Sequence, residues 1–502
     1  MAMSTLLLLA VATAALYVLR RVFPPSRSYP RARGVSLPAF LEFDRDPHKF
    51  LSYAYQSLGP LFWLDLILIR PVFALSLDAN NLFYTSAEKD LSFNQATIDV
   101  TQHILTREQV FAARLNHLLL PGISGKSRLV SYGPGMIDWT WDFAEQWANE
   151  SLSDPDGGLD LFQCISQLVT SICLGCFVGD AFAREHGIEV AALLRSFEVD
   201  ISRPVLRILP SWFPHPLFRR IAATRARWNA LIKSEIDARK ADPEATRSRN
   251  DYLQYLVNED KFQHEEEYAG IILGITFGAL VNTTMTLSWA LVHILKDSDL
   301  RKELLQEIDG SGLATSLEPH STAEELAGGI AGIQRLPLLD SVLKEVMRYY
   351  SGLALVRYTM RPTMVDGHVI PKDTYVFVSP WLTNHSPALF DGPDTFRGDR
   401  FMGINYDRAD TGKTASSKDG CKDGRLSDGF RPWGGGPHRC IGEKFALQAL
   451  KTTLFLLLAR YDPVAHGDAR GVREAVPEWS KLVGTPECKG RVGWQLKRRS
   501  PS

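Results

Sequence analysis

Hydrophobic residues recur three and four positions apart along much of the chain, which is the period of helices with one buried face. The pattern is clear across residues 132–260, where the apolar segments are separated by breaks that contain proline, glycine and aspartate. Shorter runs with strand character occur at residues 62–66, 72–76 and 364–378. The last of these is expected to be one hairpin that turns at Asp366-Gly367-His368. The pattern predicts a mainly α-helical protein with small β-sheets.

The N-terminal run is long enough to span a membrane. Residues 1–19 carry no charged side chain, and Arg20 and Arg21 follow directly. A bilayer core takes about 20 apolar residues as a helix. Because the positive charges come after the apolar run, the rest of the chain is expected on the cytosolic side. A cleaved signal peptide is the alternative, suggested by the small residues at 12–15.

The segment after this run has the composition of a linker. Residues 23–38 hold four prolines among arginines, which makes a stiff, basic connection suited to an anionic membrane surface. We therefore expect a transmembrane anchor at residues 1–22, a linker at 23–38 and one folded domain at 39–502. Within that domain, the apolar loop at 209–218 is flanked by arginines and suits either contact with a membrane interface or burial.

A second apolar stretch lies at residues 270–295, which are free of charged side chains. Hydropathy alone would allow another membrane span. The stretch also contains a polar group of residues, namely Asn282, Thr283, Thr284, Thr286, Ser288 and His293. Polar residues at this density favour a helix that is buried on all sides inside a large protein.

Charge and cysteine content narrow the function classes. The chain has 56 basic and 57 acidic residues, so no overall field favours a nucleic acid. Six cysteines in 502 residues are too few for a disulfide scaffold and suit a reducing compartment. Cys173 and Cys176 have redox or zinc spacing, but they lie in an apolar helical segment without a second Cys or His pair, which favours packing in the core.

The strongest chemical signal is the segment from Trp433 to Gly442. Three glycines and a proline precede Cys440, and a helical pattern begins at Phe445. Backbone N–H groups and the helix dipole at such a position lower the pKa of a thiol, and glycines let the main chain approach a flat partner. Cys440 is therefore a candidate axial metal ligand. A buried cysteine at a helix start is the alternative.

The spacing of these residues resembles the haem-binding loop of the cytochrome P-450 family. The resemblance implies a triangular prism of helices with small sheets, which holds haem b between this loop and a central helix. Cys440 would be the fifth ligand of the haem iron. Gly436 and Gly442 would shape the loop, and His438 would meet a haem propionate. Trp433 stands where the family usually has phenylalanine and would pack against the haem.

Residues 279–284 resemble the family motif that crosses the distal haem face. By this match Thr283, with Thr284 beside it, would hydrogen-bond iron-bound dioxygen and the waters that deliver protons. Two positions depart from the motif. Leu280 replaces a glycine, and Asn282 replaces a carboxylate. An asparagine side chain can orient a water molecule, but it cannot relay a proton by ionising.

These departures keep three functions open. The paired threonines favour a haem-thiolate monooxygenase. A thiolate-haem isomerase or dehydratase that needs no reductase is the first alternative, motivated by Leu280 and Asn282. A non-catalytic haem-binding protein is the second.

Three charged residues resemble a structural motif of the same family. Glu345 and Arg348 share one helix face at i, i+3 spacing, as in the Glu-x-x-Arg motif. Arg400 would be the third member, in a segment where Gly398 replaces the usual proline. Two arginines on one carboxylate would lock the core behind the haem.

The resemblance also implies propionate contacts. Arg357 lies at the family spacing for a propionate-binding arginine. The Trp-x-x-x-Arg pair that many members use for the same purpose is absent. Arg114, Lys126 and Arg128 are the candidates to replace it, and the sequence does not choose among them.

The chain shows no sequence motif for binding a nicotinamide dinucleotide, and this bears on where its electrons come from. It contains no glycine-rich dinucleotide fingerprint after a strand, so electrons must come from a separate protein. The resemblance implies an NADPH-dependent cytochrome P-450 reductase in the endoplasmic reticulum membrane, with the catalytic domain in the cytosol. It also implies an apolar small-molecule substrate. The glycine-rich loop and the anchor resemble those of fungal members that act in secondary-metabolite biosynthesis.

Overall fold

The computed structural model describes residues 45–64, 70–101, 121–154, 158–201, 215–259, 265–318, 321–403, 429–479 and 482–499. The expected anchor and linker at 1–38, Arg114 and most of the apolar loop at 209–218 lie outside the described residues.

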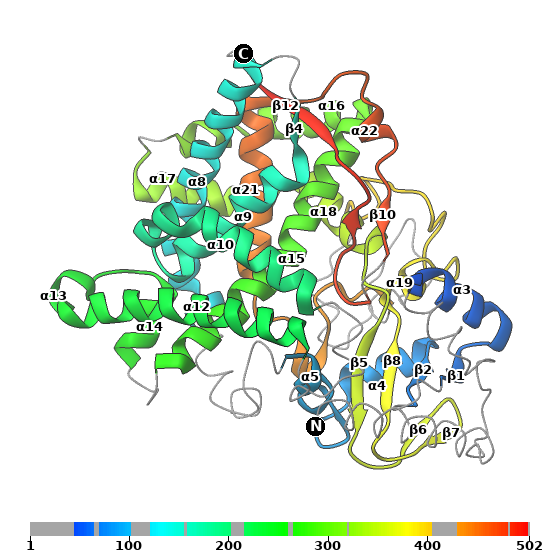
Figure 1. Cartoon of the computed structure of the whole chain (residues 1–502). Helices are drawn as coiled ribbons and strands as arrows, with labels where there is room; N and C mark the ends of the chain where they lie inside the picture. The colour runs from blue at the N-terminus through cyan, green and yellow to red at the C-terminus, as the bar shows by residue number, and fades with distance from the viewer. Residues whose placement is uncertain are drawn as a thin grey trace.

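Helices make up most of the fold, as predicted (Figure 1). Those of the helical block are α8 (Lys126–Ser153), α9 (Leu161–Phe177), α10 (Asp180–Ile201), α12 (Pro216–Ala241), α13 (Pro243–Thr246), α14 (Tyr252–Glu259), α15 (Glu265–Lys296), α16 (Ser298–Ser311), α17 (Ala323–Ile333), α18 (Pro337–Tyr349) and α21 (Glu443–Arg460). Shorter ones are α3 (Pro47–Leu58), α4 (Leu77–Thr85), α5 (Phe93–Thr101), α19 (Pro380–Asn384) and α22 (Arg470–Arg473).

Helix boundaries follow local sequence signals. The side chain of Asp160 caps α9 by accepting from the Gln163 N–H, and Thr322 with Glu325 forms a capping box at the start of α17. A tertiary cap supplements these local ones. Both carboxylate oxygens of Glu307, on α16, accept from the first N–H groups of α18, at 2.6 and 2.9 Å. Neighbouring helices are thus joined at their ends.

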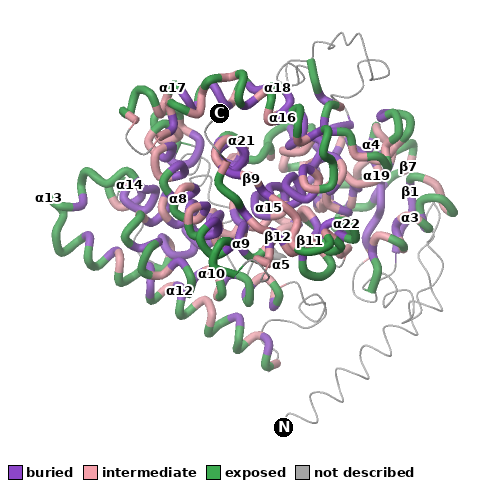
Figure 2. Tube along the Cα trace, turned by 90° about the horizontal axis from the view of Figure 1, so that it is seen from above, coloured by how far each residue is buried: buried purple, intermediate pink, exposed green. Residues whose placement is uncertain are grey.

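Helix α15 runs through the middle of the helical block and packs against α9, α12, α18 and α21 (Figures 1 and 2). Trp289, Ala290 and Leu291 have no exposed surface. By length and composition α15 could also cross a membrane, but more than half of its most apolar stretch is buried inside the protein. The central helix predicted over 270–295 is therefore confirmed, but it is not buried on all sides, because Gly278 and Asn282 are exposed.

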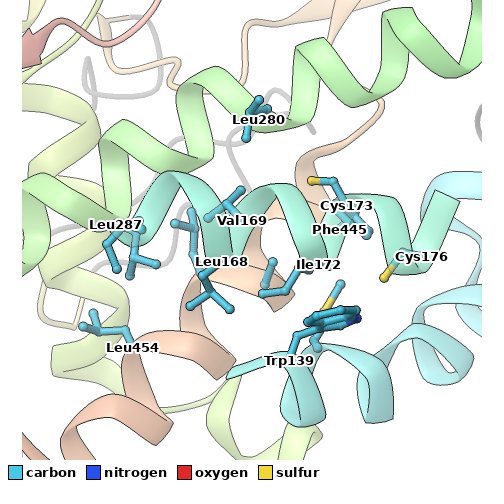
Figure 3. Close-up of a cluster of buried hydrophobic side chains, with 14 of the residues drawn as sticks. Trp139, Leu168, Val169, Ile172, Cys173, Cys176, Leu280, Leu287, Phe445 and Leu454 are labelled. Atoms are coloured by element: carbon cyan, nitrogen blue, oxygen red, sulfur yellow. The ribbon is translucent and has the colours of Figure 1, made fainter. Parts of the chain in front are cut away.

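The core around α15 contains the paired cysteines. Figure 3 shows Trp139 of α8, Ile172 and Cys173 of α9, Leu287 of α15 and Phe445 of α21 in one apolar cluster. Burial raises the pKa of the Cys173 thiol to about 12. Among the described residues, no three His, Cys, Asp or Glu side chains gather as a metal site. The prediction that Cys173 and Cys176 pack in the core is confirmed.

The sheets lie beside the helical block. The largest has the strand order β1 (Leu61–Trp63), β2 (Val72–Ala74), β8 (Tyr375–Val378), β5 (Leu355–Thr359) and β3 (Leu91–Ser92). A second has β12 (Gly493–Arg498) between β4 (Leu159–Asp160) and β9 (Tyr461–Ala465). Two hairpins complete the set, β6 (Thr363–Val365) with β7 (His368–Ile370), and β10 (Pro477–Glu478) with β11 (Glu487–Cys488).

The hairpin expected over residues 364–378 is shorter than predicted. Strands β6 and β7 turn at Asp366 and Gly367, whose φ angles of 49° and 77° are those of a tight hairpin turn. Strand β8 leaves this hairpin and pairs with β5 and β2. The alternation of apolar residues identified the strands correctly, but it carries no information on which strand is the partner.

Candidate functional site

The loop before α21 has a fold that its glycines require. Gly434 and Gly436 have φ angles of 73° and 60°, in the left-handed region. A Cβ on Gly436 would also collide with the backbone oxygen of Tyr84. The Cys440 N–H donates to the Trp433 carbonyl at 2.8 Å and closes the loop. These constraints leave the Cys440 side chain exposed at the end of the loop.

Two features of the surroundings shift the pKa of the Cys440 thiol in opposite directions. Although solvent reaches the Cys440 side chain, the protein atoms around the thiol displace part of its water and raise its pKa, while the N–H groups of Gly442 and Glu443 lower it. The net direction is upward, which differs from the expectation drawn from the helix start alone. In the protein without a bound metal, desolvation therefore changes the thiol pKa more than the helix N-terminus does. A metal ion deprotonates a coordinating thiol through its own charge.

A buried arginine lies near this loop, behind α4. Arg357, on β5, is 1 % exposed and stands 4.9 Å over the Phe83 ring. Its Nη1 donates to the Ser86 carbonyl at 3.0 Å, whereas its Nε has no partner. Within the described part of the chain, no ion pair joins Arg357 to a carboxylate, and burial lowers its pKa. The nearby charge of Glu88 offsets the cost of burying this guanidinium only in part, so the site fits the acidic group of a bound molecule.

His438 lies against an acidic residue that the sequence did not suggest. Its Nε2 is 2.8 Å from a carboxylate oxygen of Glu88. Glu88 also accepts from the Ser92 hydroxyl and from the backbone N–H groups of Phe93 and Asn94 at the start of α5. Burial raises the Glu88 pKa, but these hydrogen bonds together lower it to about 2. The Glu88 carboxylate therefore lies between the His438 ring and the start of α5, and it brings the cysteine loop close to that helix.

The central helix places its candidate residues on different faces. Thr283 is buried and lines a small apolar pocket with Cys173, Leu287 and Phe445, so it lies beside the helix that follows Cys440. Thr284 is buried and its hydroxyl has no partner. Asn282 is exposed, and its Oδ1 accepts from the Thr485 N–H at 3.0 Å.

Leu280, on the same helix, packs into the apolar core. It belongs to the apolar cluster around α9 and is 7 % exposed (Figure 3). The larger side chain is therefore accommodated by packing against neighbouring helices.

Glu345, Arg348 and Arg400 come together in the interior. The Glu345 carboxylate accepts from Arg348 Nε at 2.7 Å and Nη2 at 2.8 Å, and from Arg400 Nε at 2.9 Å. Their side chains are 0 %, 0 % and 5 % exposed. The arginines also donate to backbone carbonyls of the chain segment before Phe401, including Asn384, Asp391, Gly392, Pro393 and Thr395. This network ties α18 to that segment.

Two of the candidates to replace the Trp-x-x-x-Arg pair, Arg128 and Lys126, belong to the described residues. Arg128 donates to the Asn250 carbonyl at 2.8 Å and lies over the Tyr255 ring. Lys126 is an exposed residue at the start of α8. Instead, the Ser124 hydroxyl donates to the Ile441 carbonyl and anchors the loop from this side. Neither Ser124 nor Glu88 belongs to a recognisable motif, and only their contacts across the fold identify them.

Comparison with known proteins gives consistent matches. Residues 34–479 match the model of the family described as cytochrome P-450. The cytochrome P-450 monooxygenase pynD of Aspergillus niger is 26 % identical over 456 residues, which cover 87 % of this chain and 86 % of the relative. The monooxygenase pytD of Aspergillus terreus is 28 % identical over 74 % of this chain and 92 % of its own length. Human lanosterol 14-alpha demethylase is 22 % identical over 84 % of this chain and 78 % of its own length.

Proposed function

The chain belongs to the cytochrome P-450 family, and from that premise we propose that it is a haem-thiolate monooxygenase whose iron ligand is Cys440. It inserts one oxygen atom of O2 into a C–H bond or alkene of an apolar small molecule. The observation that supports this most is the glycine-dependent loop that leaves Cys440 exposed at the start of α21. The family match and the relatives named as monooxygenases support the reaction class.

The residues present fit haem b. The unpaired Nε of buried Arg357 is a donor available to a propionate. His438, which lies beside Glu88, would be at the haem edge, and Trp433, Gly436 and Gly442 would flank the porphyrin. When bound, the haem supplies thiolate-ligated iron that activates dioxygen. Cys440 holds that iron, and the apolar side chains around Thr283 exclude water.

Proton delivery in this proposal depends on the hydroxyl of Thr283. It lies on α15 beside the start of α21, in a pocket lined by apolar side chains and by Thr453. A positioned proton donor contributes about 10²- to 10⁴-fold in rate. Thr284, the next residue on the helix, has a buried hydroxyl without a partner in the described fold and would assist this delivery.

The electron source and the location are part of the same proposal. Electrons come from NADPH through a separate membrane-bound reductase, and the domain is held at the cytosolic face of the endoplasmic reticulum by residues 1–22. The substrate is an apolar intermediate of secondary metabolism. Support comes from the uncharged N-terminal run and from relatives that include fungal monooxygenases.

Reconstitution tests the reaction class. The haem-loaded full chain, mixed with a fungal NADPH-cytochrome P-450 reductase and a library of apolar terpenoids and polyketides, is expected to form products only when NADPH, O2 and reductase are all present. The mass of the product should exceed that of the substrate by one oxygen atom. Isomerised product formed without NADPH or reductase would contradict a monooxygenase and identify a thiolate-haem isomerase.

Replacing Arg357 tests the propionate contact. Arg357→Met keeps much of the side-chain volume but removes the charge, so haem retention is expected to fall about 10- to 150-fold, from a lost charge-assisted bond of about 1.5–3 kcal/mol. The measurement is the rate of haem transfer to apomyoglobin. Arg361→Met, which removes an exposed arginine paired with Asp90, is the control. Equal transfer rates in both variants would exclude Arg357 as a haem contact.

A further inference from the structure

One face of α15 remains accessible beside Thr283. Gly278 and Asn282, one helical turn apart, are exposed, whereas Leu280, Thr283 and Thr284 are buried. Asn282 therefore stands at the boundary between the helix core and the space next to the proposed reaction site. Its side chain neither caps a helix nor forms an ion pair in the described structure. It contacts a segment far along the chain.

That segment, residues 482–486, is held on α15 at two points. The Thr485 N–H donates to Asn282 Oδ1 at 3.0 Å. Two helical turns further along, the buried Trp289 Nε1 donates to the Pro486 carbonyl at 2.9 Å. Positions 282 and 289 are seven apart and so lie on the same side of the helix. The two side chains together hold adjacent residues of the segment against the helix.

The backbone of the segment is shaped for this contact. Gly484 has a φ of 88°, which favours glycine, and a Cβ there would lie 3.0 Å from Asn282 Oδ1. On the other side, a Cβ on Gly352 would lie 2.9 Å from the Gly484 nitrogen. The Ala354 N–H donates to the Leu482 carbonyl at 2.8 Å. The segment thus lies between α15 and the chain that leads into β5.

We propose that Asn282 is a positioning residue that fixes residues 482–486 beside Thr283 and so shapes the substrate pocket. The consequence for substrate rests on the proposed function, whereas the contact itself does not. Holding the segment requires only that the amide oxygen of Asn282 accept a hydrogen bond. A neutral side chain can do this, whereas a proton relay would need a carboxylate. Val483, 59 % exposed, is the apolar side chain that the fixed segment carries.

Hydrogen exchange tests the contact without any substrate. In the haem-loaded full chain, Asn282→Leu removes the acceptor, and Asn282→Asp keeps one. Asn229→Leu on α12, a partly buried position, is the matched control. The Thr485 amide is expected to exchange about 2- to 10-fold faster in Asn282→Leu and at the parent rate in the other two. Unchanged exchange in Asn282→Leu, or equal acceleration in Asn282→Asp, would overturn the proposal.

Ligand binding tests the consequence for the pocket. Imidazole and 4-phenylimidazole both ligate haem iron, but only the larger probe extends away from it. Asn282→Leu is expected to change the Kd of 4-phenylimidazole by at least about 3-fold and to leave that of imidazole unchanged. An equal effect on both probes, or on neither, would contradict a role in shaping the pocket. Absence of any azole spectrum in the parent would instead reject the proposed haem site, and the exchange result would still stand.

Discussion

Glu345→Gln is expected to lower the free energy of unfolding by about 3–5 kcal/mol, the range for breaking a buried ion pair by removing one partner. The reason is the position of its carboxylate. It accepts from both arginines and from the Arg397 N–H, and neither Glu345 nor Arg348 has any exposed side-chain surface. A neutral amide would leave two buried guanidinium groups without a counter-charge. The shift is measured by guanidinium denaturation of the haem-loaded protein.

The chain offers a matched control for this change. Glu189 pairs with Arg227 at 2.6 Å, but both side chains are well exposed, at 40 % and 52 %. Solvent screens such a pair, so Glu189→Gln is expected to leave the unfolding transition unchanged. If Glu345→Gln unfolds at the same denaturant concentration as Glu189→Gln, the buried network does not stabilise the fold.

Thr283→Ala is expected to lower product formation about 10²-fold, the lower end of the contribution of a positioned proton donor. The substitution removes one hydroxyl from a pocket whose lining is apolar apart from Thr453, so binding of apolar ligands should change little. NADPH should still be consumed, with the electrons recovered as hydrogen peroxide. The measurement is the ratio of product to NADPH oxidised in the reconstituted system.

Thr276→Ala is the control for Thr283→Ala. Thr276 is on the same helix, has no exposed surface, and has a hydroxyl without a partner. It lies two turns before Thr283 and is not in the pocket described above. Its replacement should leave the product-to-NADPH ratio at the parent value. If both variants lose coupling to the same extent, the effect comes from helix packing and not from proton delivery.

Features coded by neighbouring residues could be predicted from the sequence. The charge-free stretch at 270–295 became α15, and the glycine-rich loop leads into α21, because helical period and glycine content act locally. The placement of Glu345 and Arg348 on one face follows from their spacing on α18. The third member, Arg400, came from family resemblance, because nothing in helix geometry joins residues 55 positions apart.

Contacts between distant segments could not be predicted. Glu88 meets His438, and Thr485 meets Asn282 from 203 positions away. No periodicity or motif encodes such pairs, since each depends on how whole elements pack. Strand β8 was assigned to the wrong partner for the same reason. The thiol of Cys440 shows a further limit, because the helix start was visible in the sequence whereas the desolvation that raises its pKa was not.

The central claim is that Cys440 is the thiolate ligand of a haem iron, and the ferrous carbon monoxide difference spectrum tests it most directly. The full chain is expected to give the red-shifted Soret band of thiolate-ligated haem, and Cys440→Ala is expected to lose it. Cys173→Ala, which changes a buried core cysteine, should keep the band. A parent protein without haem, or a band that survives in Cys440→Ala, would contradict the assignment of this loop.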